Sequence, residues 1–163
     1  MAVAELTVRR LAPDDAESLR CFYNGLSARS KRLFHPLGDE AAQERYREIV
    51  ENNRPGASPN YDLVAVDGDR VVGWCFLWQR DGKPGEAAFG LGVADDMQGV
   101  GLGNRLMEAV LAAARPQGFR LICLSVVQDN VVAQHLYEKH GFVRTGSYVG
   151  RDGLDYFSMQ KAD

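Results

Sequence analysis

Three glycines separate an apolar segment from a helix-like segment in the second half of this 163-residue chain. The sequence Gln98-Gly99-Val100-Gly101-Leu102-Gly103 lies between apolar residues 87–93 and residues 102–115, which have the apolar spacing of a helix. Glycine allows a positive φ and lets a ligand approach the backbone closely. The first N–H groups of a helix lack internal partners and lie at the positive end of its dipole. The turn therefore predicts a binding site for a phosphate group.

The spacing of these glycines excludes two common phosphate loops. A P-loop requires a lysine after its last glycine, and no lysine follows Gly103. A dinucleotide fingerprint that starts at Gly101 requires a third glycine where Leu106 stands. The pattern that fits is Gln-x-x-Gly-x-Gly, while a turn that only caps the helix is the alternative for an isolated G-x-G.

A second pattern follows the glycine turn and makes its identity more specific. An apolar run at 121–127 precedes Gln128-Asp129-Asn130, a helical segment at 131–140 and then Gly141-Phe142. Residues 86–143 as a whole resemble the GNAT superfamily of N-acetyltransferases, and the second pattern matches it at Asn130, Ala133, Tyr137, Gly141 and Phe142. The resemblance implies transfer of an acetyl group from acetyl-coenzyme A, without a metal, to a primary amine of a small molecule or of a protein lysine or N-terminus. The reaction expected is direct attack by the amine.

The resemblance also implies the fold, an α/β (α+β) arrangement in one domain over residues 1–163. A central, mixed but mostly antiparallel seven-stranded sheet is flanked by about four helices, and one pair of parallel strands splays apart. The residues agree, because the short turns Asp67-Gly68-Asp69 and Arg151-Asp152-Gly153 predict antiparallel hairpins. We expect strands at 6–11, 61–66, 70–79, 86–93, 121–127, 143–149 and 154–160. We expect helices at 13–26, 39–52, 102–115 and 131–140, an irregular segment at 27–38 and a surface loop at 53–60.

For the cofactor, the resemblance implies a pantetheine arm in the gap between strands 86–93 and 121–127. Backbone groups of Leu91 and Val93 are expected to bind this amide chain as an added strand would. The other residues expected to contact the cofactor are Gln98, Gly99, Val100, Gly101, Gly103, Asn104, Asn130, Ala133 and Tyr137. Gly90 and Gly92 indicate either a close approach or bulge at this strand, or small residues packed under an aromatic side chain.

The reaction needs a proton donor for the departing thiolate and a route by which the amine loses its proton. A tyrosine with a pKa of about 10 stays protonated at neutral pH and can donate to a thiolate whose parent thiol has a pKa of about 8.5. Tyr137 matches the family's position for this acid, and a core aromatic is the alternative. The family's usual glutamate base falls on Ala88 here, and Glu86 lies two residues upstream on the same face of the strand. Glu86 is predicted as the base, acting through water, with an exposed hairpin-end residue as the alternative.

The resemblance implies that the acceptor groove is built from the first two helices, their connecting loop and the last hairpin. The candidate substrate contacts there are Phe34, His35, Tyr148 and Tyr156, with Asp155 beside them. Acidic and aromatic side chains suit a cationic amine, and ordinary loop composition is the alternative. His135 and His140 are expected to pack or face solvent, and no spacing links the three histidines as metal ligands.

The net charge of −3 and the pI near 5.6 argue against a nucleic-acid partner, which requires a basic surface. No apolar stretch is long enough to span a membrane, and the first residues lack the pattern of a signal peptide, so a cytoplasmic location is expected. Three widely spaced cysteines are expected to be reduced. Many relatives pair through their last strands, which makes a homodimer one expected arrangement.

Two other functions fit the same sequence pattern. One is a module that binds or senses coenzyme A without turnover, which the displaced glutamate favours. The other is an enzyme of the same fold that uses a longer acyl group or another acyl carrier. Transfer assays against a panel of amines distinguish an enzyme from a sensor.

Overall fold

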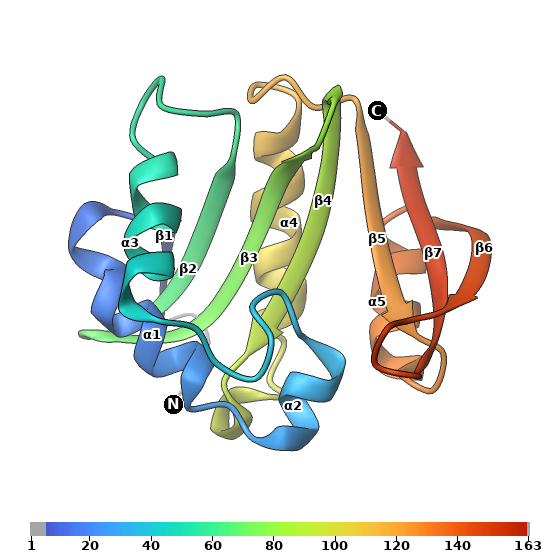
Figure 1. Ribbon diagram of the computed structural model, residues 1–163, viewed down its shortest axis with the longest axis horizontal. Helices are drawn as coiled ribbons and strands as arrows, with labels where there is room; N and C mark the ends of the chain where they lie inside the picture. The colour runs from blue at the N-terminus through green and yellow to red at the C-terminus, as the bar shows by residue number, and fades with distance from the viewer. Residues whose placement is uncertain (1–5, 163) are drawn as a thin grey trace.

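Seven strands form one mixed sheet in the order β1-β2-β3-β4-β5-β7-β6, in the computed structural model that describes residues 6–162 (Figure 1). The strands are β1 (Thr7–Arg10), β2 (Tyr61–Asp67), β3 (Arg70–Arg80), β4 (Lys83–Val93), β5 (Leu121–Val127), β6 (Val143–Val149) and β7 (Asp155–Ala162). The helices are α1 (Ala16–Asn24), α2 (Ala28–Leu33), α3 (Gln43–Asn52), α4 (Leu102–Ala114) and α5 (Val131–Lys139), with short 3-10 turns η2 (Pro13–Asp15) and η3 (Asp95–Met97). None of these helices is long and apolar enough to cross a membrane.

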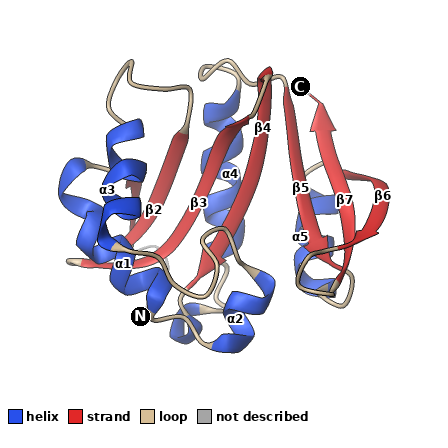
Figure 2. Ribbon diagram, in the orientation of Figure 1, coloured by secondary structure: helices blue, strands red, loops and turns tan. Residues whose placement is uncertain are grey.

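The helices cover both faces of the sheet. α1 and α3 lie in front of β1 to β3, while α4 and α5 lie behind the sheet (Figures 1 and 2). All neighbouring strands are antiparallel except β4 and β5. This arrangement confirms the mixed seven-stranded fold that the family resemblance implies.

The parallel strands β4 and β5 pair over only three residues before they diverge. The paired residues are Glu86 with Leu121, Ala87 with Ile122 and Ala88 with Cys123. Beyond this point the two strands separate, as Figure 2 shows, so residues 89–93 and 124–127 do not hydrogen-bond to each other across the sheet. The expected splay is confirmed, and it leaves backbone edges inside a sheet where a strand would otherwise lie.

The helix α2 was not expected, because residues 27–38 are predicted to be irregular. Ser27 caps this helix by accepting a hydrogen bond from the Ser30 N–H at 3.1 Å. The helix is also stabilised by η3, where Asp95 accepts hydrogen bonds from the hydroxyls of Ser27 at 2.7 Å and Ser30 at 2.5 Å. A helix of six residues is too short to show an apolar period in the sequence. Asp95, which stabilises it, lies more than sixty residues away along the chain.

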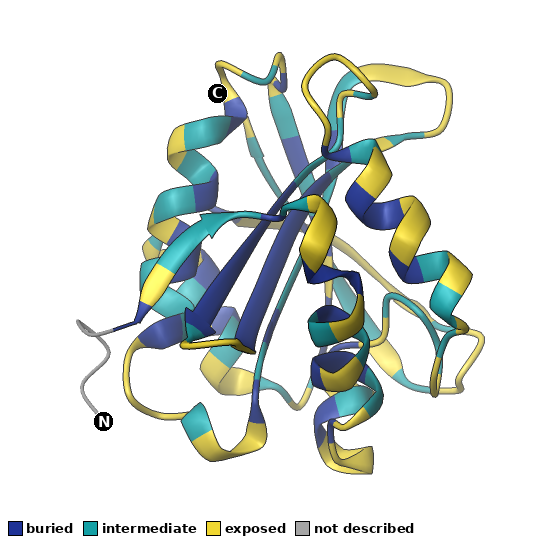
Figure 3. Cartoon of the chain, turned by 90° about the vertical axis from the view of Figure 1, so that its left-hand side faces the viewer, coloured by how far each residue is buried: buried dark blue, intermediate teal, exposed yellow. Residues whose placement is uncertain are grey.

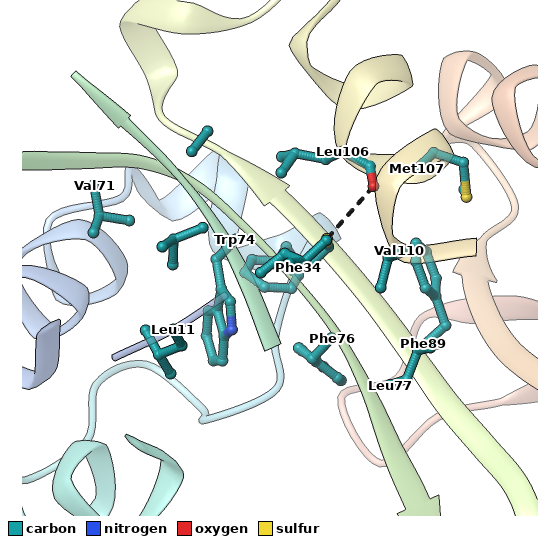
Figure 4. Packing of buried hydrophobic residues seen from close by; sticks show 14 of the residues in the cluster. Leu11, Phe34, Val71, Trp74, Phe76, Leu77, Phe89, Leu106, Met107 and Val110 are labelled. Carbon is teal, nitrogen blue, oxygen red and sulfur yellow. Dashed lines mark hydrogen bonds between the residues drawn. The ribbon is translucent and has the colours of Figure 1, made fainter. Parts of the chain in front are cut away.

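The sheet divides the core into two layers. The strands in its centre are buried between half-exposed helices (Figure 3). On one face Phe34, Trp74 and Phe76 pack together, with ring centroids 5.6 Å apart for Phe34 and Trp74 and 5.3 Å apart for Trp74 and Phe76. On the other face, α4 contributes the side chains of Leu106, Met107 and Val110 (Figure 4).

This aromatic packing explains Gly90 and Gly92. A Cβ at Gly90 would lie 2.4 Å from the Phe76 ring, and one at Gly92 would lie 2.2 Å from the Phe34 ring. The register between β3 and β4 is regular at both positions, so neither glycine marks a bulge. Small residues packed under aromatic rings are therefore observed, while a close approach of a ligand at this strand stays a prediction. The packing fixes where Phe34 and Phe76 lie above β4.

A fully buried carboxylate on the same face of the sheet supports these aromatic rings. Asp62 accepts hydrogen bonds from Asn53 Nδ2 at 2.8 Å, Trp74 Nε1 at 2.8 Å and Trp78 Nε1 at 3.0 Å. Burial raises the pKa of Asp62 to about 6, and these donors oppose the rise. At neutral pH the carboxylate is therefore ionised and holds two indole rings in place.

We expect Asp62→Asn to lower the free energy of unfolding by about 1–3 kcal/mol, because a buried donor is left without an acceptor. The amide oxygen can replace the carboxylate oxygen that faces Asn53 and Trp78, but the amide nitrogen then faces the Trp74 N–H. Urea unfolding measures the effect, with the exposed turn residue Asp81→Asn as the matched control. Equal stability of the two variants would show that the indole hydrogen bonds contribute nothing net.

Candidate active site

The glycine turn adopts the backbone conformation that its sequence predicts. Gly99 and Gly101 have φ values of 78° and 89°, in the left-handed region that favours glycine. Gly101 is the N-cap of α4, and the first hydrogen bond of this end of the helix runs from the Arg105 N–H to the Gly101 carbonyl at 3.2 Å. The N–H groups of residues 102–104 have no partner within the helix, and no side chain caps them. Free N–H groups at the positive end of a helix favour an anion, and binding of a phosphate here stays a prediction.

Gly103 is not required by the protein's own backbone or packing. Its φ is not positive, and a Cβ there would meet only Leu91 Cδ2 at 3.5 Å and Leu136 Cδ2 at 3.7 Å, which are ordinary contacts. Leu91 belongs to β4 and Leu136 to α5, so this position faces the space between the two halves of the sheet. Glycine keeps that space open, which fits a ligand that passes from the phosphate loop into the gap.

The side chain of Gln98 binds within the protein. Its Nε2 donates to Ser30 Oγ at 3.0 Å and to the Val93 carbonyl at 3.1 Å, which joins the loop to α2 and to the end of β4. The hydrogen bonds from Ser30 and Ser27 lower the pKa of Asp95, which anchors the same junction. Gln98 therefore sets the position of the loop, and contact of Gln98, Val93 or the exposed Val100 with a cofactor stays a prediction.

A cleft of about 1020 Å³ runs along the front of β4, β5 and β7 at the splay. The strand register places Trp78, Ala88, Cys123 and Gln160 in one row across four strands. The next row holds Phe76 and Gly90 on one side of the gap and Ser125 and Ser158 on the other. All eight residues line the cleft, together with Leu91 and Tyr137 from its inner side and residues of α2 and the β6–β7 turn at its mouth.

Tyr137 occupies the inner wall of this cleft. Its ring packs edge-on against Phe89 and is tilted against Phe142, with centroids 5.9 Å away in both cases, and 8% of the residue is exposed. Burial raises the pKa of Tyr137 to about 12. The hydroxyl is therefore protonated at neutral pH, as a proton donor must be.

The other cofactor candidates on α5 and α4 have structural partners. Asn130 caps α5, since its Oδ1 accepts from the Ala133 N–H at 3.3 Å. Asn104 donates to Glu108 Oε1 at 3.0 Å, and its Oδ1 lies 2.8 Å from His140 Nε2. These contacts fix the start of α5 and join α4 to the end of α5. Cofactor contacts of Asn104, Asn130 and Ala133 stay predictions.

The structure separates Glu86 from the cleft by an arginine. Glu86 and Ala88 lie on one face of β4, as predicted, but Glu86 Oε1 accepts a hydrogen bond from Arg80 Nη1 at 2.9 Å. Arg80 lines the cleft, and its Nη1 lies 3.5 Å from Cys123 Sγ. Glu86 is not among the residues that line the cleft. Whether Glu86 is the base stays a prediction.

The four candidate acceptor contacts all line the same cleft. Phe34 is a core residue with 8% exposure, while His35 is exposed and its Nδ1 lies 3.0 Å from the Lys31 carbonyl. The rings of Tyr148 and Tyr156 stack with centroids 5.3 Å apart and an angle of 10°. Burial and the hydrogen bond to Asp152 raise the pKa of Tyr156 to about 12.

Several cleft residues were not identified from sequence, namely Phe76, Trp78, Arg80, Ser125 and Asp152. The alternation of 76, 78 and 80 along β3 places them on one face, and this signal was readable in the sequence. Nothing local shows that this face borders the cleft, because that depends on the small residues of β4 opposite. Within residues 6–162, no group of three or more His, Cys, Asp or Glu side chains is arranged to hold a metal ion.

Comparison with known proteins matches residues 23–142 to the model of the acetyltransferase (GNAT) family. The mycothiol acetyltransferase of Geodermatophilus obscurus is 37% identical over 97 residues, which cover 55% of this chain and 31% of that protein. The 5-NmdU N-acetyltransferase of Pseudomonas phage PaMx11 is 30% identical over 122 residues, which cover 72% of this chain and 85% of that protein. The chain thus spans about a third of the first relative and most of the second.

Solved structures have the same fold. An acetyltransferase of the GNAT family from Streptococcus pneumoniae superposes with a TM-score of 0.83 at 26% identity, over 98% of this chain and 100% of that one. The structure of yncA from Salmonella typhimurium with its cofactor acetyl-CoA has a TM-score of 0.77 at 21% identity, over 97% and 94% of the two chains.

Proposed function

Because this chain belongs to the acetyltransferase (GNAT) family, we propose that it transfers an acetyl group from acetyl-coenzyme A to a primary amine by direct attack of the amine. The observation that carries the proposal is a series of neighbouring features that would form a route for the cofactor. The N–H groups at the start of α4 lack helical partners, Gly103 beside them faces Leu91, and Leu91 and Tyr137 line the cleft at the gap between β4 and β5. The N-acetyltransferase relative and the relative solved with acetyl-CoA support this assignment.

The residues along this route fit the parts of acetyl-coenzyme A. The N–H groups of residues 102–104 would bind the pyrophosphate, and the unpaired edges of β4 and β5 would hydrogen-bond to the pantetheine amides. When bound, the cofactor supplies a thioester whose acetyl group is open to attack by an amine. Tyr137 would hold a proton close to the sulfur and donate it as the thiolate leaves.

An amine that resembles lysine has a pKa of about 10.4 and arrives protonated at neutral pH. Its proton must leave before attack. Glu86 would receive it through water that passes Arg80, because Arg80 lines the cleft and donates a hydrogen bond to Glu86. The carboxylate is half-buried and paired with Arg80. Substitution of Glu86 tests whether it receives the proton of the amine.

Release of free thiol from acetyl-coenzyme A tests the proposed activity. Thiol release is expected to depend on an added primary amine, with one acetylated amine formed for each thiol. Binding of acetyl-coenzyme A without transfer to any amine of a panel of polyamines, amino acids, aryl amines and lysine peptides would contradict the proposal.

We expect Glu86→Gln to reduce kcat/KM most at low pH and to recover partly as rising pH supplies free amine. Glutamine keeps the size of the side chain and an oxygen that can accept from Arg80. The affinity for acetyl-coenzyme A, measured by calorimetry, serves as the control and should not change. A loss that is equal at every pH would show that Glu86 only positions Arg80, and no loss would show that the proton leaves by another route.

A further inference from the structure

We propose that the acceptor is a monoamine on a flat aromatic body, bound between two stacked aromatic pairs on opposite sides of the gap between β4 and β5. The first pair is Phe76 with Trp78 from β3, and the second is Tyr148 with Tyr156 from β6 and β7. This inference rests on the proposed function, and it names the class of amine that the cleft selects.

The first aromatic pair lines the cleft beside β4, where Phe76 is 5% exposed and Trp78 is partly exposed. Phe76 and Trp78 stack with centroids 3.9 Å apart and an angle of 18°. They lie opposite Gly90 and Ala88 in the register of β4, so no larger side chain on that strand covers them. The Trp78 indole donates a hydrogen bond to Asp62, and the Arg45 guanidinium lies 5.5 Å from its ring centroid. Ordered rings lose little conformational freedom when they bind a ligand.

The second aromatic pair lies across the gap. The sheet order puts β3 on one side of the parallel strands, and β7 and β6 on the other. Tyr148 is 45% exposed, which is high for an aromatic ring, yet its hydroxyl donates to Ser125 Oγ on β5 at 2.7 Å. The hydroxyl of Tyr156 donates to Asp152. These hydrogen bonds fix the orientation of both rings, and both line the mouth of the cleft, where a ligand can contact them.

The charges of the cleft do not select a polyamine. Among residues 6–162, three arginines line it, Arg32, Arg80 and Arg151, with a single carboxylate, Asp152. Asp152 already accepts hydrogen bonds from the Tyr156 hydroxyl and the Leu154 N–H. Acidic partners of two arginines lie outside the lining, since Asp129 pairs with Arg32 and Glu86 pairs with Arg80. The chain has a net charge of −3, but its acids are not gathered here.

A ligand with several ammonium groups would thus meet guanidinium groups without a matching set of carboxylates. One ammonium group suits one carboxylate, and the remaining recognition surface is aromatic. Stacking of aromatic rings contributes about 0.5–1.5 kcal/mol beyond the burial of apolar area. Discrimination by ring shape is therefore expected at the level of about threefold to tenfold between amines of equal charge and similar size.

The test compares kcat/KM for 2-phenylethylamine, n-hexylamine and spermidine with acetyl-coenzyme A as donor. We expect wild type to prefer 2-phenylethylamine over n-hexylamine by about threefold to tenfold and to use spermidine least. Tyr148→Ala should abolish the preference for the ring, while Tyr148→Phe, which keeps the ring and removes the hydroxyl, should retain it. Tyr148 is exposed, and the ratio of two substrates is independent of the amount of active protein.

Three outcomes would overturn this inference while the proposed function stands. They are a preference for spermidine, equal use of the two monoamines, and a preference for the ring that survives Tyr148→Ala. A loss of the preference in Tyr148→Phe as large as in Tyr148→Ala would also overturn it, because the hydroxyl and not the ring would then be recognised. Failure to acetylate any amine would instead contradict the proposed function.

Discussion

Tyr137→Phe is expected to lower kcat by on the order of 100-fold without changing the fold or the affinity for acetyl-coenzyme A. The substitution removes only the hydroxyl, and the packing of the ring against Phe89 and Phe142 does not depend on it. Because the pKa of Tyr137 is raised to about 12, the hydroxyl is protonated throughout the range of practical assays. The loss should therefore be about equal from pH 6 to pH 9, since no change of ionisation intervenes.

Tyr61→Phe is the matched control for this variant. Tyr61 lies on β2, outside the residues that line the cleft, and the Arg10 guanidinium lies 4.5 Å from its ring centroid. Tyr61→Phe also removes one hydroxyl, and its turnover is expected to be close to that of wild type. If Tyr137→Phe also turned over at the wild-type rate across this pH range, the ring would serve packing alone and another group would protonate the thiolate.

Gly103→Glu is expected to lower the affinity for acetyl-coenzyme A by about 10- to 100-fold while the melting temperature stays equal or rises. The new carboxylate would lie beside the free N–H groups where the pyrophosphate is proposed to bind, and like charges about 4 Å apart repel by about 1–4 kcal/mol. The fold gains from the same change, because an acidic residue in the first helical turn is favourable and glycine is a poor helix former. Binding and stability would thus move in opposite directions.

Gly103→Ala provides the control for Gly103→Glu. Alanine adds a Cβ that meets only ordinary contacts within the protein and adds no charge, so its affinity should fall less than that of Gly103→Glu. Calorimetric titration with coenzyme A measures both variants, and thermal unfolding checks their stability. Unchanged affinity in a folded Gly103→Glu protein would move the phosphate site away from the start of α4.

The features that the sequence predicts well are those with local causes. Gly99 and Gly101 adopt the left-handed conformation because the turn and the start of α4 depend on neighbouring residues. The hairpins and the strand-helix order follow from short turns for the same reason. The splay of β4 and β5 has no local signature, and it was expected only because residues 86–143 resemble a family that has it.

The features that the sequence missed depend on distant partners. The helix α2 is stabilised by Asp95, and Trp78 is oriented by Asp62, which lies on a different strand. Arg80 and Glu86 are cross-strand neighbours beside the β3–β4 turn, where the register shifts between Gln79 and Arg80. Which face of this hairpin borders the cleft depends on the assembled sheet, so the sequence alone does not show that Arg80 lines the cleft.

If the amine attacks the thioester directly, the protein carries no acetyl group at any stage, and mass spectrometry of the intact protein measures this. Cys123 lines the cleft in the row next to Ser125 and is the thiol available to accept an acetyl group first. The protein is mixed with isotope-labelled acetyl-coenzyme A, and its mass is measured before and after 2-phenylethylamine is added. Direct attack predicts an unmodified chain at first, and then one labelled amide for each thiol released. A labelled acetyl group on Cys123 that passes to the amine would contradict it.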